Sequence, residues 1–229
     1  MKNICIFGDS IGKGVALNSL SERYEIVKLD LSRILKPRQK VNIKNYSSFG
    51  CTVTKGLSII EKHEEKLSGY DTAILEFGGN DCNFIWEEVA RLPDKEHKPN
   101  TSPEEFSANY LKAVGIVQKA GLKPVLVNLP PLDAKKFLNW ISRGINGANI
   151  LKWLGGVEAI YRWQEMYSLA VVKIAQKLSV SLADVRSEFL KRRDFSALLC
   201  EDGMHPTRKG HELIAKTVYE NIMLQGQTA

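Results

Sequence analysis

The first strand of the chain can be recognised from its sequence, and it constrains the fold more than any other feature. The apolar run from Ile4 to Phe7 begins almost at the first residue and stops abruptly at Gly8, Asp9 and Ser10. A short apolar run that ends in glycine is typical of a strand buried on both faces, as in a parallel sheet. Open α/β sheets bind ligands at the carboxyl ends of such strands, so Ser10 lies where a functional side chain is expected.

Strand and helix patterns alternate along the rest of the chain. Short apolar or alternating runs between turn residues predict four more strands, over 40–46, 72–77, 123–129 and 180–185. Apolar residues at helical spacing predict helices over 25–36, 52–67, 103–120, 157–178, 187–193 and 206–223. This alternation predicts a three-layer α/β/α fold with a five-stranded parallel sheet, built as a single domain from residues 1–229.

Three stretches show no such regularity. Residues 15–23 are polar and mixed, and we interpret them as irregular or short-helical. Residues 82–100 are interpreted as a loop, and residues 132–156 have no clear period. Because both of these stretches follow predicted strands, we expect them to overhang the edge of the sheet where Ser10 lies. Their aromatic side chains would line an acyl pocket, stack on sugar rings or pack in an ordinary core.

Composition excludes several classes of protein. No apolar run approaches the ~20 residues of a membrane helix, and the first run is shorter than the roughly 7–15 residues of a secretion signal. The four cysteines are scattered and form no CxxC pair, which favours reduced thiols in a cytoplasmic protein. The basic residues behind the net charge of +6 are dispersed, so we expect neither a nucleic-acid partner nor a membrane partner.

Neither a metal nor an organic cofactor is predicted. Four histidines without a CxxC pair give a zinc site little support. Gly8 to Lys13 lacks the spacing of a phosphate-binding P-loop, because Gly12 comes one residue too early and Gly14 follows the lysine. A dinucleotide fingerprint would need a third glycine where Leu17 stands.

Polar turns follow three of the predicted strands, at Ser10, Gly50 and Asn80. The carboxyl ends of parallel strands share one edge of the sheet, so these residues are expected to lie side by side. Together they suit acyl transfer: the serine offers a nucleophilic Oγ, the glycine an unobstructed backbone N–H, and the asparagine a side-chain donor for an oxyanion.

A base for this chemistry is found near the end of the chain. Asp202 and His205 are three residues apart in a turn before the last predicted helix, so the carboxylate can orient the imidazole. Each motif also has an ordinary structural interpretation. Ser10 or Asp202 could cap a helix, and Gly50 or Asn80 could simply form a turn. Asp9 and Asp81 are expected to brace the loops, and the histidines His63, His97 and His211 are interpreted as surface residues.

These four segments resemble the conserved blocks of the SGNH hydrolases, the GDSL esterase/lipase family. Gly8-Asp9-Ser10-Ile11 is similar to the nucleophile block, with isoleucine in place of the usual leucine. The other three blocks follow in the family's order, as Gly50, Gly78-Gly79-Asn80-Asp81 and Asp202-Gly203-Met204-His205. The resemblance implies a flavodoxin-like sheet and a triad of Ser10, His205 and Asp202. It also implies an oxyanion hole made by the backbone amides of Ser10 and Gly50 and the side chain of Asn80.

The resemblance implies a serine esterase that works through an acyl-enzyme, with a small-molecule acyl ester as substrate. We expect small acyl groups, above all acetyl, and a carbohydrate O-deacetylase fits the aromatic residues of the two overhanging stretches. Three alternatives stay open: an acyltransferase with the same triad, a short-chain lipase or thioesterase, and a catalytically silent binding domain. The sequence contains no signal for an oligomeric state.

Overall fold

A parallel β-sheet forms the centre of the molecule. The computed structural model describes residues 2–30, 34 and 40–224. Its sheet has the strand order β4-β1-β5-β6-β7, and every neighbouring pair is parallel. The strands are β1 (Lys2–Gly8), β4 (Val41–Asn45), β5 (Thr72–Glu76), β6 (Lys123–Val127) and β7 (Ser181–Ala183). The predicted five-stranded parallel sheet is therefore confirmed, in the flavodoxin-like order whose ligand site lies where the first and third strands meet.

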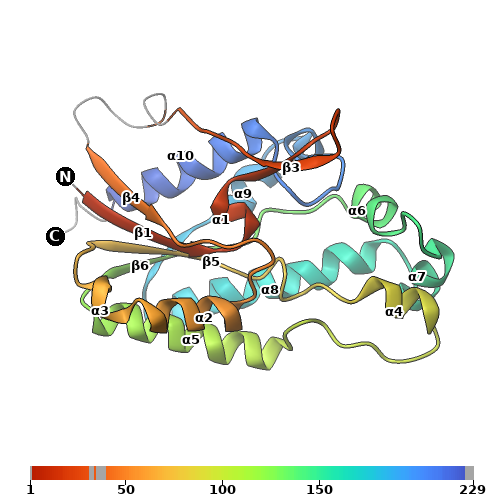
Figure 1. Ribbon diagram of the computed structural model, residues 1–229, viewed down its shortest axis with the longest axis horizontal. Coiled ribbons are helices and arrows are strands. Elements are labelled where there is room, and N and C mark those ends of the chain that lie inside the picture. The colour runs from red at the N-terminus through yellow and green to blue at the C-terminus, as the bar shows by residue number, and fades with distance from the viewer. Residues whose placement is uncertain (1, 31–33, 35–39, 225–229) are drawn as a thin grey trace.

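Helices cover both faces of this sheet and complete the predicted three layers (Figure 1). One face carries α2 (Val53–Lys62), α3 (Glu64–Leu67), α5 (Pro103–Lys119) and α8 (Glu158–Leu178). The other carries α9 (Val185–Leu190) and α10 (Arg208–Leu224). None of the described helices is long and apolar enough to cross a membrane.

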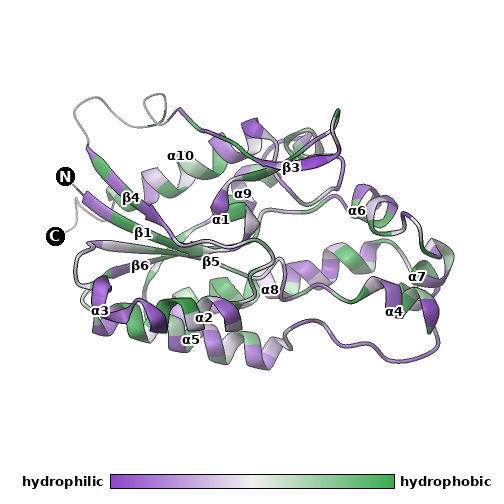
Figure 2. Cartoon of the chain, viewed as in Figure 1, coloured by the Kyte–Doolittle hydropathy of each residue, from purple (hydrophilic) through white to green (hydrophobic). Residues whose placement is uncertain are grey.

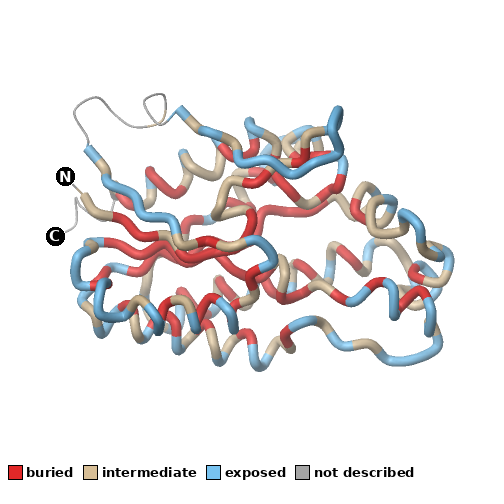
Figure 3. The backbone as a smooth tube through the Cα atoms, viewed as in Figure 1, coloured by how far each residue is buried: buried red, intermediate tan, exposed pale blue. Residues whose placement is uncertain are grey.

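The alternation of side chains along the strands divides the core into two layers. In β1, Ile4 packs toward α9 and α10, whereas Cys5 and Phe7 pack toward α2, α5 and α8. The apolar sides of the helices face the sheet, and the strands of its middle are buried (Figures 2 and 3). Glu76, at the end of β5, is an ionisable residue among these apolar side chains, and it is only 3% exposed.

A third apolar cluster lies beyond the carboxyl ends of the strands (Figure 1). It is built from α4 (Trp86–Arg91), α6 (Ala134–Ile141), α7 (Gly147–Leu154) and the first turns of α8. The prediction of a loop over 82–100 was therefore wrong for α4, and residues 132–156, for which no period was found, hold α6 and α7. Each of these helices has only six to eight residues, and about two turns are too few for a helical period to be recognised in the sequence.

The segment after Ser10 also differs from its prediction. Residues 15–23 and the start of the helix expected over 25–36 form an antiparallel hairpin of β2 (Val15–Asn18) and β3 (Arg23–Ile26). Val15 and Leu17 are buried on one side of it, which is a strand period rather than a helical one. Residues 27–30 are not helical, and 31–33 and 35–39 lie outside the described residues. A 3-10 turn, η2 (Phe195–Leu198), follows α9.

Candidate active site

Ser10 is the first residue of a one-turn helix, α1 (Ser10–Lys13), directly after β1. The N-cap of this helix is Asp9, whose Oδ1 accepts a hydrogen bond of 2.7 Å from the N–H of Ile11. Helix capping therefore does not explain Ser10, and its hydroxyl is free for another partner. The side chain is almost buried and lines a cavity at the carboxyl edge of the sheet.

The partner of Ser10 is His205, although 195 positions separate the two residues in the sequence. Ser10 Oγ lies 2.9 Å from His205 Nε2, and His205 Nδ1 lies 2.7 Å from Asp202 Oδ2. Asp202 is fully buried and His205 is 4% exposed. The structure thus brings together the serine, histidine and aspartate that the sequence predicted, in the order that activates a serine.

Asp202 is fixed by the turn that holds it. Its Oδ1 accepts hydrogen bonds from the backbone N–H groups of Met204 and His205, at 3.1 and 3.0 Å, which leaves Oδ2 for the imidazole. Burial opposes ionisation of Asp202, but the bond to His205 and these two amides outweigh it and lower the pKa of the carboxyl. The group is therefore a carboxylate aimed at His205, and it starts no helix, because α10 begins only at Arg208.

One backbone amide in the nucleophile turn is free. The N–H groups of Asp9 and Gly12 donate to Glu76 Oε2 at 3.3 and 2.9 Å, and that of Ile11 donates to Asp9. The N–H of Ser10 donates to no acceptor among the described residues. A free amide next to the nucleophile is what an oxyanion hole requires.

Asn80 follows β5 and lines the same cavity as Ser10. Its Nδ2 donates to Asp9 Oδ2 at 3.0 Å and to the carbonyl oxygen of Cys51 at 3.3 Å. Both neighbours are acceptors, so they fix which end of the amide is NH₂. The backbone carbonyl oxygen of Asn80 accepts a bond of 2.9 Å from Asn100 Nδ2, which fixes the main chain at this position.

Gly50 lies at the rim of the site. It is exposed, has a φ of +62°, and its N–H donates to no described acceptor. The structure places the preceding residue, Phe49, in the cavity wall but does not place Gly50 there. Its positive φ explains why a glycine stands at this turn, since other residues rarely adopt that conformation.

The cavity beside Ser10 has a volume of about 420 Å³ and a largely aromatic wall. Seven aromatic rings line it: Tyr24, Phe49, Phe84, Trp86, Phe137, Trp153 and Trp163. Two of the indole N–H groups are already bound within the protein, Trp86 to Asn83 Oδ1 at 2.7 Å and Trp163 to the carbonyl of Cys82 at 3.1 Å. The wall therefore offers ring surface more than hydrogen-bonding groups.

The β2–β3 hairpin packs over His205 through the ring of Tyr24. The ring of Tyr24 lies 4.8 Å from that of His205, and the ring of Phe49 lies 6.1 Å from it. Burial and the charge of Asp202 raise the pKa of Tyr24. The ring of Tyr24 also makes an edge-to-face contact with Trp140 of α6, with the ring centroids 6.5 Å apart. These contacts shield one side of His205 from water. They could not be expected from the sequence, because the hairpin itself was not predicted.

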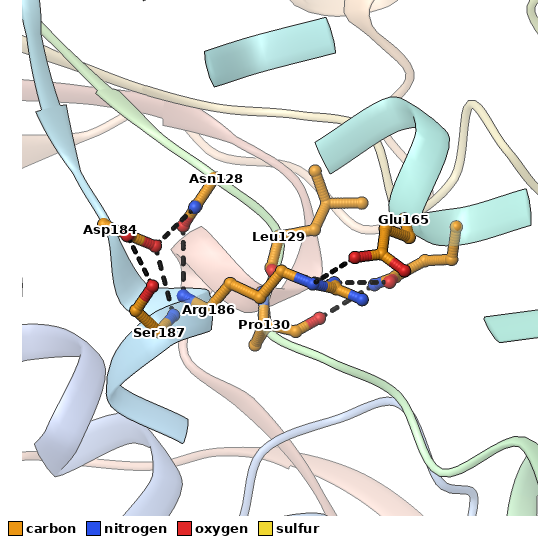
Figure 4. A network of polar contacts seen from close by, with 8 residues as sticks. Asn128, Leu129, Pro130, Glu165, Asp184, Arg186 and Ser187 are labelled. Atoms are coloured by element: carbon orange, nitrogen blue, oxygen red, sulfur yellow. Dashed lines mark hydrogen bonds and ion pairs between the residues drawn. The ribbon is translucent and has the colours of Figure 1, made fainter. Parts of the chain in front are cut away.

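A buried arginine stiffens the far wall of the cavity (Figure 4). Arg186, in α9, donates from Nη1 to the carbonyl oxygen of Leu129 at 3.3 Å and to Gln164 Oε1 at 2.8 Å. Gln164 Nε2 in turn donates to the carbonyl oxygen of Pro130 at 2.8 Å. Leu129, Pro130 and Gln164 all line the cavity, so this network ties its wall to two helices.

Three acids with no predicted catalytic role, Asp9, Asp81 and Glu76, complete the surroundings. Asp9 bridges Ile11 and Asn80, and Asp81 Oδ1 accepts a bond of 2.9 Å from the N–H of Val53 at the start of α2, so the expectation that both brace the loops is confirmed. Burial raises the pKa of Asp81 to about 6. Glu76, which binds the nucleophile turn, was missed, although it is the only charged residue in the apolar run of 72–77.

Of the three histidines predicted to lie at the surface, His63 and His97 are partly exposed and His211 is not. His211 is buried, with Nε2 2.9 Å from the carbonyl oxygen of Val15, because α10 packs against the hairpin there. His97 is among the residues that line the cavity, and its Nε2 lies 2.9 Å from the carbonyl oxygen of Leu92. Among the described residues, no group of three or more metal-ligating side chains is placed to hold an ion.

Comparison with solved structures finds the same fold in several hydrolases. A lipase/acylhydrolase from Enterococcus faecalis is 20% identical, with a TM-score of 0.67 over 99% of this chain and 97% of that one. A variant of an acetyl-xylooligosaccharide esterase from Geobacillus Stearmophilus is 16% identical, with a TM-score of 0.66 over 96% and 94%. A psychrotrophic esterase from Pseudoalteromonas is 16% identical, with a TM-score of 0.61 over the whole of both chains.

Comparison by sequence identifies the family. A search of curated proteins found no match. The model of the GDSL-like lipase/acylhydrolase family, however, matches residues 6–213, which include every residue of the site described above. The chain therefore belongs to the GDSL-like lipase/acylhydrolase family, the SGNH hydrolases, and is a carboxylic ester hydrolase.

Proposed function

We propose that the enzyme hydrolyses esters through an acyl-enzyme on Ser10, with His205 as general base and acid and Asp202 orienting His205. The observation that carries this proposal is the continuous buried chain of hydrogen bonds, 2.9 Å from Ser10 to His205 and 2.7 Å from His205 to Asp202. A serine hydroxyl is a weak nucleophile unless a base takes its proton during attack, and His205 is positioned to do so.

Both halves of the reaction use the same nitrogen. Ser10 Oγ attacks the carbonyl carbon while His205 Nε2 takes its proton, which gives a tetrahedral oxyanion. The bond to the alkoxy oxygen then breaks, and the alcohol leaves with the proton from Nε2. In the second half, water attacks the acyl carbon and gives a proton to Nε2, and Ser10 recovers that proton as the carboxylic acid departs.

The oxyanion would be stabilised by the backbone amides of Ser10 and Gly50 and by Asn80 Nδ2. The support is that both amides bind no described acceptor and that Asn80 is fixed with its NH₂ end toward acceptors. Donors of this kind each contribute about 3–4 kcal/mol to the stability of the transition state.

Labelling with a fluorophosphonate probe tests the assignment of the nucleophile. The probe reacts with a serine only where a base activates it, so the label should appear on the peptide that contains Ser10. The Ser10→Ala variant should take up no label under the same conditions. A label on a different serine, or undiminished labelling of the variant, would show that another group is the nucleophile.

For the acyl group, the first candidate is acetyl, with a carbohydrate as the alcohol. It is supported by aromatic rings at the mouth of the cavity, Tyr24 and Phe49, which offer stacking surface. An acetyl-xylooligosaccharide esterase shares the fold, although at 16% identity that likeness extends to the fold alone.

A second candidate, an ester with a longer apolar acyl chain, is favoured by the interior of the cavity. An acetyl group would leave most of the roughly 420 Å³ empty. The indole N–H groups of Trp86 and Trp163 and the amide of Gln164 are already bound by protein groups, so sugar hydroxyls would find few partners there. A short-chain lipase or thioesterase activity would use such a cavity more fully.

Esters of graded acyl length separate the two candidates. If the chain enters the cavity, kcat/KM for p-nitrophenyl esters should rise about fourfold for each added methylene, because each buried methylene contributes about 0.8 kcal/mol. If acetyl is the natural group, kcat/KM should be highest for the acetate and fall as the chain lengthens.

Replacing two alanines, one at a time, by phenylalanine tests whether the acyl chain binds in this cavity. Ala159→Phe narrows the cavity and should lower kcat/KM for the longer esters about tenfold, the equivalent of losing between one and two buried methylenes, while sparing the acetate. Ala148→Phe adds the same ring at an exposed position of α7 outside this cavity and serves as the control. Equal losses for all chain lengths in Ala159→Phe would contradict binding of the chain there.

Hydrolysis is proposed over acyl transfer, because nothing in the described site favours an alcohol acceptor over water. We also infer that the enzyme acts as one domain in the cytoplasm, without a metal or organic cofactor. The four cysteines support a reducing environment, since all are free and buried. Transfer that exceeded hydrolysis in the presence of added alcohols would favour the acyltransferase instead.

A further inference from the structure

Two acidic side chains are buried beside the nucleophile turn, and the mechanism proposed above uses neither. Asp9 is 1% and Glu76 3% exposed, and the register of β1 and β5 pairs Glu76 with Gly8. The two carboxyl groups are neighbours, because the backbone N–H of Asp9 itself donates to Glu76 Oε2 at 3.3 Å. Among the described residues, no lysine or arginine lies within ion-pair distance of either group.

Two neighbouring buried carboxyl groups are most stable when one of them keeps its proton. Two adjacent buried negative charges without a cation repel each other, so such a pair keeps a proton that a single exposed carboxyl would have lost. In agreement with this, burial raises the pKa of both acids, and for Glu76, where the charge of Asp9 adds to burial, the pKa lies well above its ordinary value of 4.5.

The backbone contacts indicate which acid carries the proton. Both oxygens of Asp9 accept hydrogen bonds, Oδ1 from Ile11 N at 2.7 Å and Oδ2 from Asn80 Nδ2 at 3.0 Å, as a carboxylate does. Glu76 accepts its two backbone bonds, from Asp9 N and Gly12 N, on the single atom Oε2. Its Oε1 accepts no hydrogen bond from a described residue and is therefore the oxygen left to carry the proton.

We propose that Glu76 is a neutral acid that shares its proton with the Asp9 carboxylate, and that this pair positions Ser10 and Asn80 for catalysis. Glu76 is a positioning residue here, because it touches the nucleophile turn and not the substrate. The inference rests on the proposed function of Ser10 and Asn80, and it adds the group that holds both in place.

The packing around the pair explains why it is confined to one arrangement. A Cβ on Gly8 would come within 2.9 Å of Glu76 Oε2, and a Cβ on Gly12 within 3.0 Å, so two glycines make room for the acid. Asp9 in turn presents a carboxylate to Asn80, which keeps the NH₂ end of that amide directed into the site. Loss of the proton donor would leave Asp9 free to turn away from Asn80.

Five titratable groups of neighbouring elements act on the pair. Negative charge on Asp81 disfavours ionisation near it, and positive charge on His205 favours the Asp9 carboxylate. The other three groups are two thiols and a phenol, which are neutral when protonated. The thiols of Cys51 and Cys82 interact electrostatically with Asp9, and the phenol of Tyr110 interacts with Glu76. None of them supplies a permanent cation, so the shared proton is the group that neutralises the pair.

Two variants of Glu76 test the role in catalysis. Glu76→Gln keeps a neutral side chain that can donate to Asp9 and accept from the turn, so its kcat should stay of the same order as that of the wild type. Glu76→Leu has a similar size but neither function, and its kcat should fall by about 10²-fold with little change in KM, as for a displaced oxyanion donor. Equal loss of kcat in both variants would mean that a charge on Glu76 is required and would overturn the proposal.

Stability as a function of pH tests the proton itself and needs no activity. The pKa of Glu76 is raised in the fold, so between pH 4.5 and this raised pKa the folded wild type holds a proton that the unfolded chain has lost. The contribution of Glu76 to stability is therefore complete below pH 4.5 and is lost as the pH rises toward the folded pKa. Glu76→Gln carries no such proton. The Tm of the variant relative to the wild type should therefore increase between about pH 5 and about pH 8.

The opposite slope, a variant that becomes relatively less stable as pH rises, would mean that Glu76 is ionised in the fold. Glu88→Gln, on an exposed turn of α4, is the matched control and should show no such pH-dependent difference. Failure of this proposal can be distinguished from failure of the proposed function, because the two are tested by different measurements. If Ser10 is not the nucleophile, the fluorophosphonate label moves elsewhere, whereas the difference in Tm between Glu76→Gln and the wild type keeps its dependence on pH.

Discussion

Ser10→Ala is expected to lower kcat for ester hydrolysis by roughly 10⁴- to 10⁶-fold while leaving the fold intact. The substitution removes the atom that attacks the substrate, and no other hydroxyl lies at hydrogen-bond distance from His205 Nε2 in the described site. Some rate above that of water should persist, because the oxyanion donors and the cavity are unchanged. Initial rates with a p-nitrophenyl ester, together with Tm, measure both parts of this expectation.

Ser47→Ala is the matched control for this loss. Ser47 is buried close to the same turn, and its hydroxyl has no hydrogen-bond partner among the described residues. Removing that hydroxyl should therefore leave kcat and Tm near their wild-type values. Hydrolysis by Ser10→Ala at the wild-type rate would remove Ser10 from the mechanism.

Asp202→Asn is expected to lower kcat by about 10⁴-fold with only a modest change in KM. Asp202 Oδ1 accepts from the backbone of Met204 and His205, so the asparagine must keep its carbonyl oxygen there. Its NH₂ group is then forced to face His205 Nδ1 and donates to it. The imidazole responds by carrying its proton on Nε2, where it can no longer accept the proton of Ser10.

Asp184→Asn provides the comparison for Asp202→Asn. Asp184 caps α9 and accepts from Ser187 and Asn128, away from the triad. Its replacement should reduce Tm through the weakened cap but leave kcat unchanged. If Asp202→Asn kept a substantial fraction of the wild-type kcat at neutral pH, the orienting role of Asp202 would be wrong.

The elements that form the site could be predicted because each signal is local in the sequence. The run before Ser10 ends in a sharp turn, and the spacing of Asp202 and His205 lets one residue bind the other within a single turn. What joins these distant segments is the parallel sheet, and the alternation of strands and helices was enough to predict it. The contact between Ser10 and His205 follows from that topology.

The surroundings of the site could not be predicted in the same way. The hairpin strands β2 and β3 have four residues each, too few for a period of two to stand out from irregular sequence. The cavity wall depends on α6 and α7, of eight residues each, whose packing against Trp86 and the other aromatic rings is long-range. Tyr24 reaches His205 only because the hairpin folds back over the triad.

The amide of Asn80 has a consequence for how the enzyme divides its affinity between substrate and transition state. In the resting site both of its N–H bonds have acceptors, the Asp9 carboxylate and the more distant carbonyl of Cys51. The neutral carbonyl of a bound ester gains little by competing with another neutral carbonyl, whereas a developing alkoxide is a far stronger acceptor. In the proposed mechanism, Asn80 therefore contributes to the rate of the chemical step and almost nothing to the retention of the ester, which is the division that favours turnover.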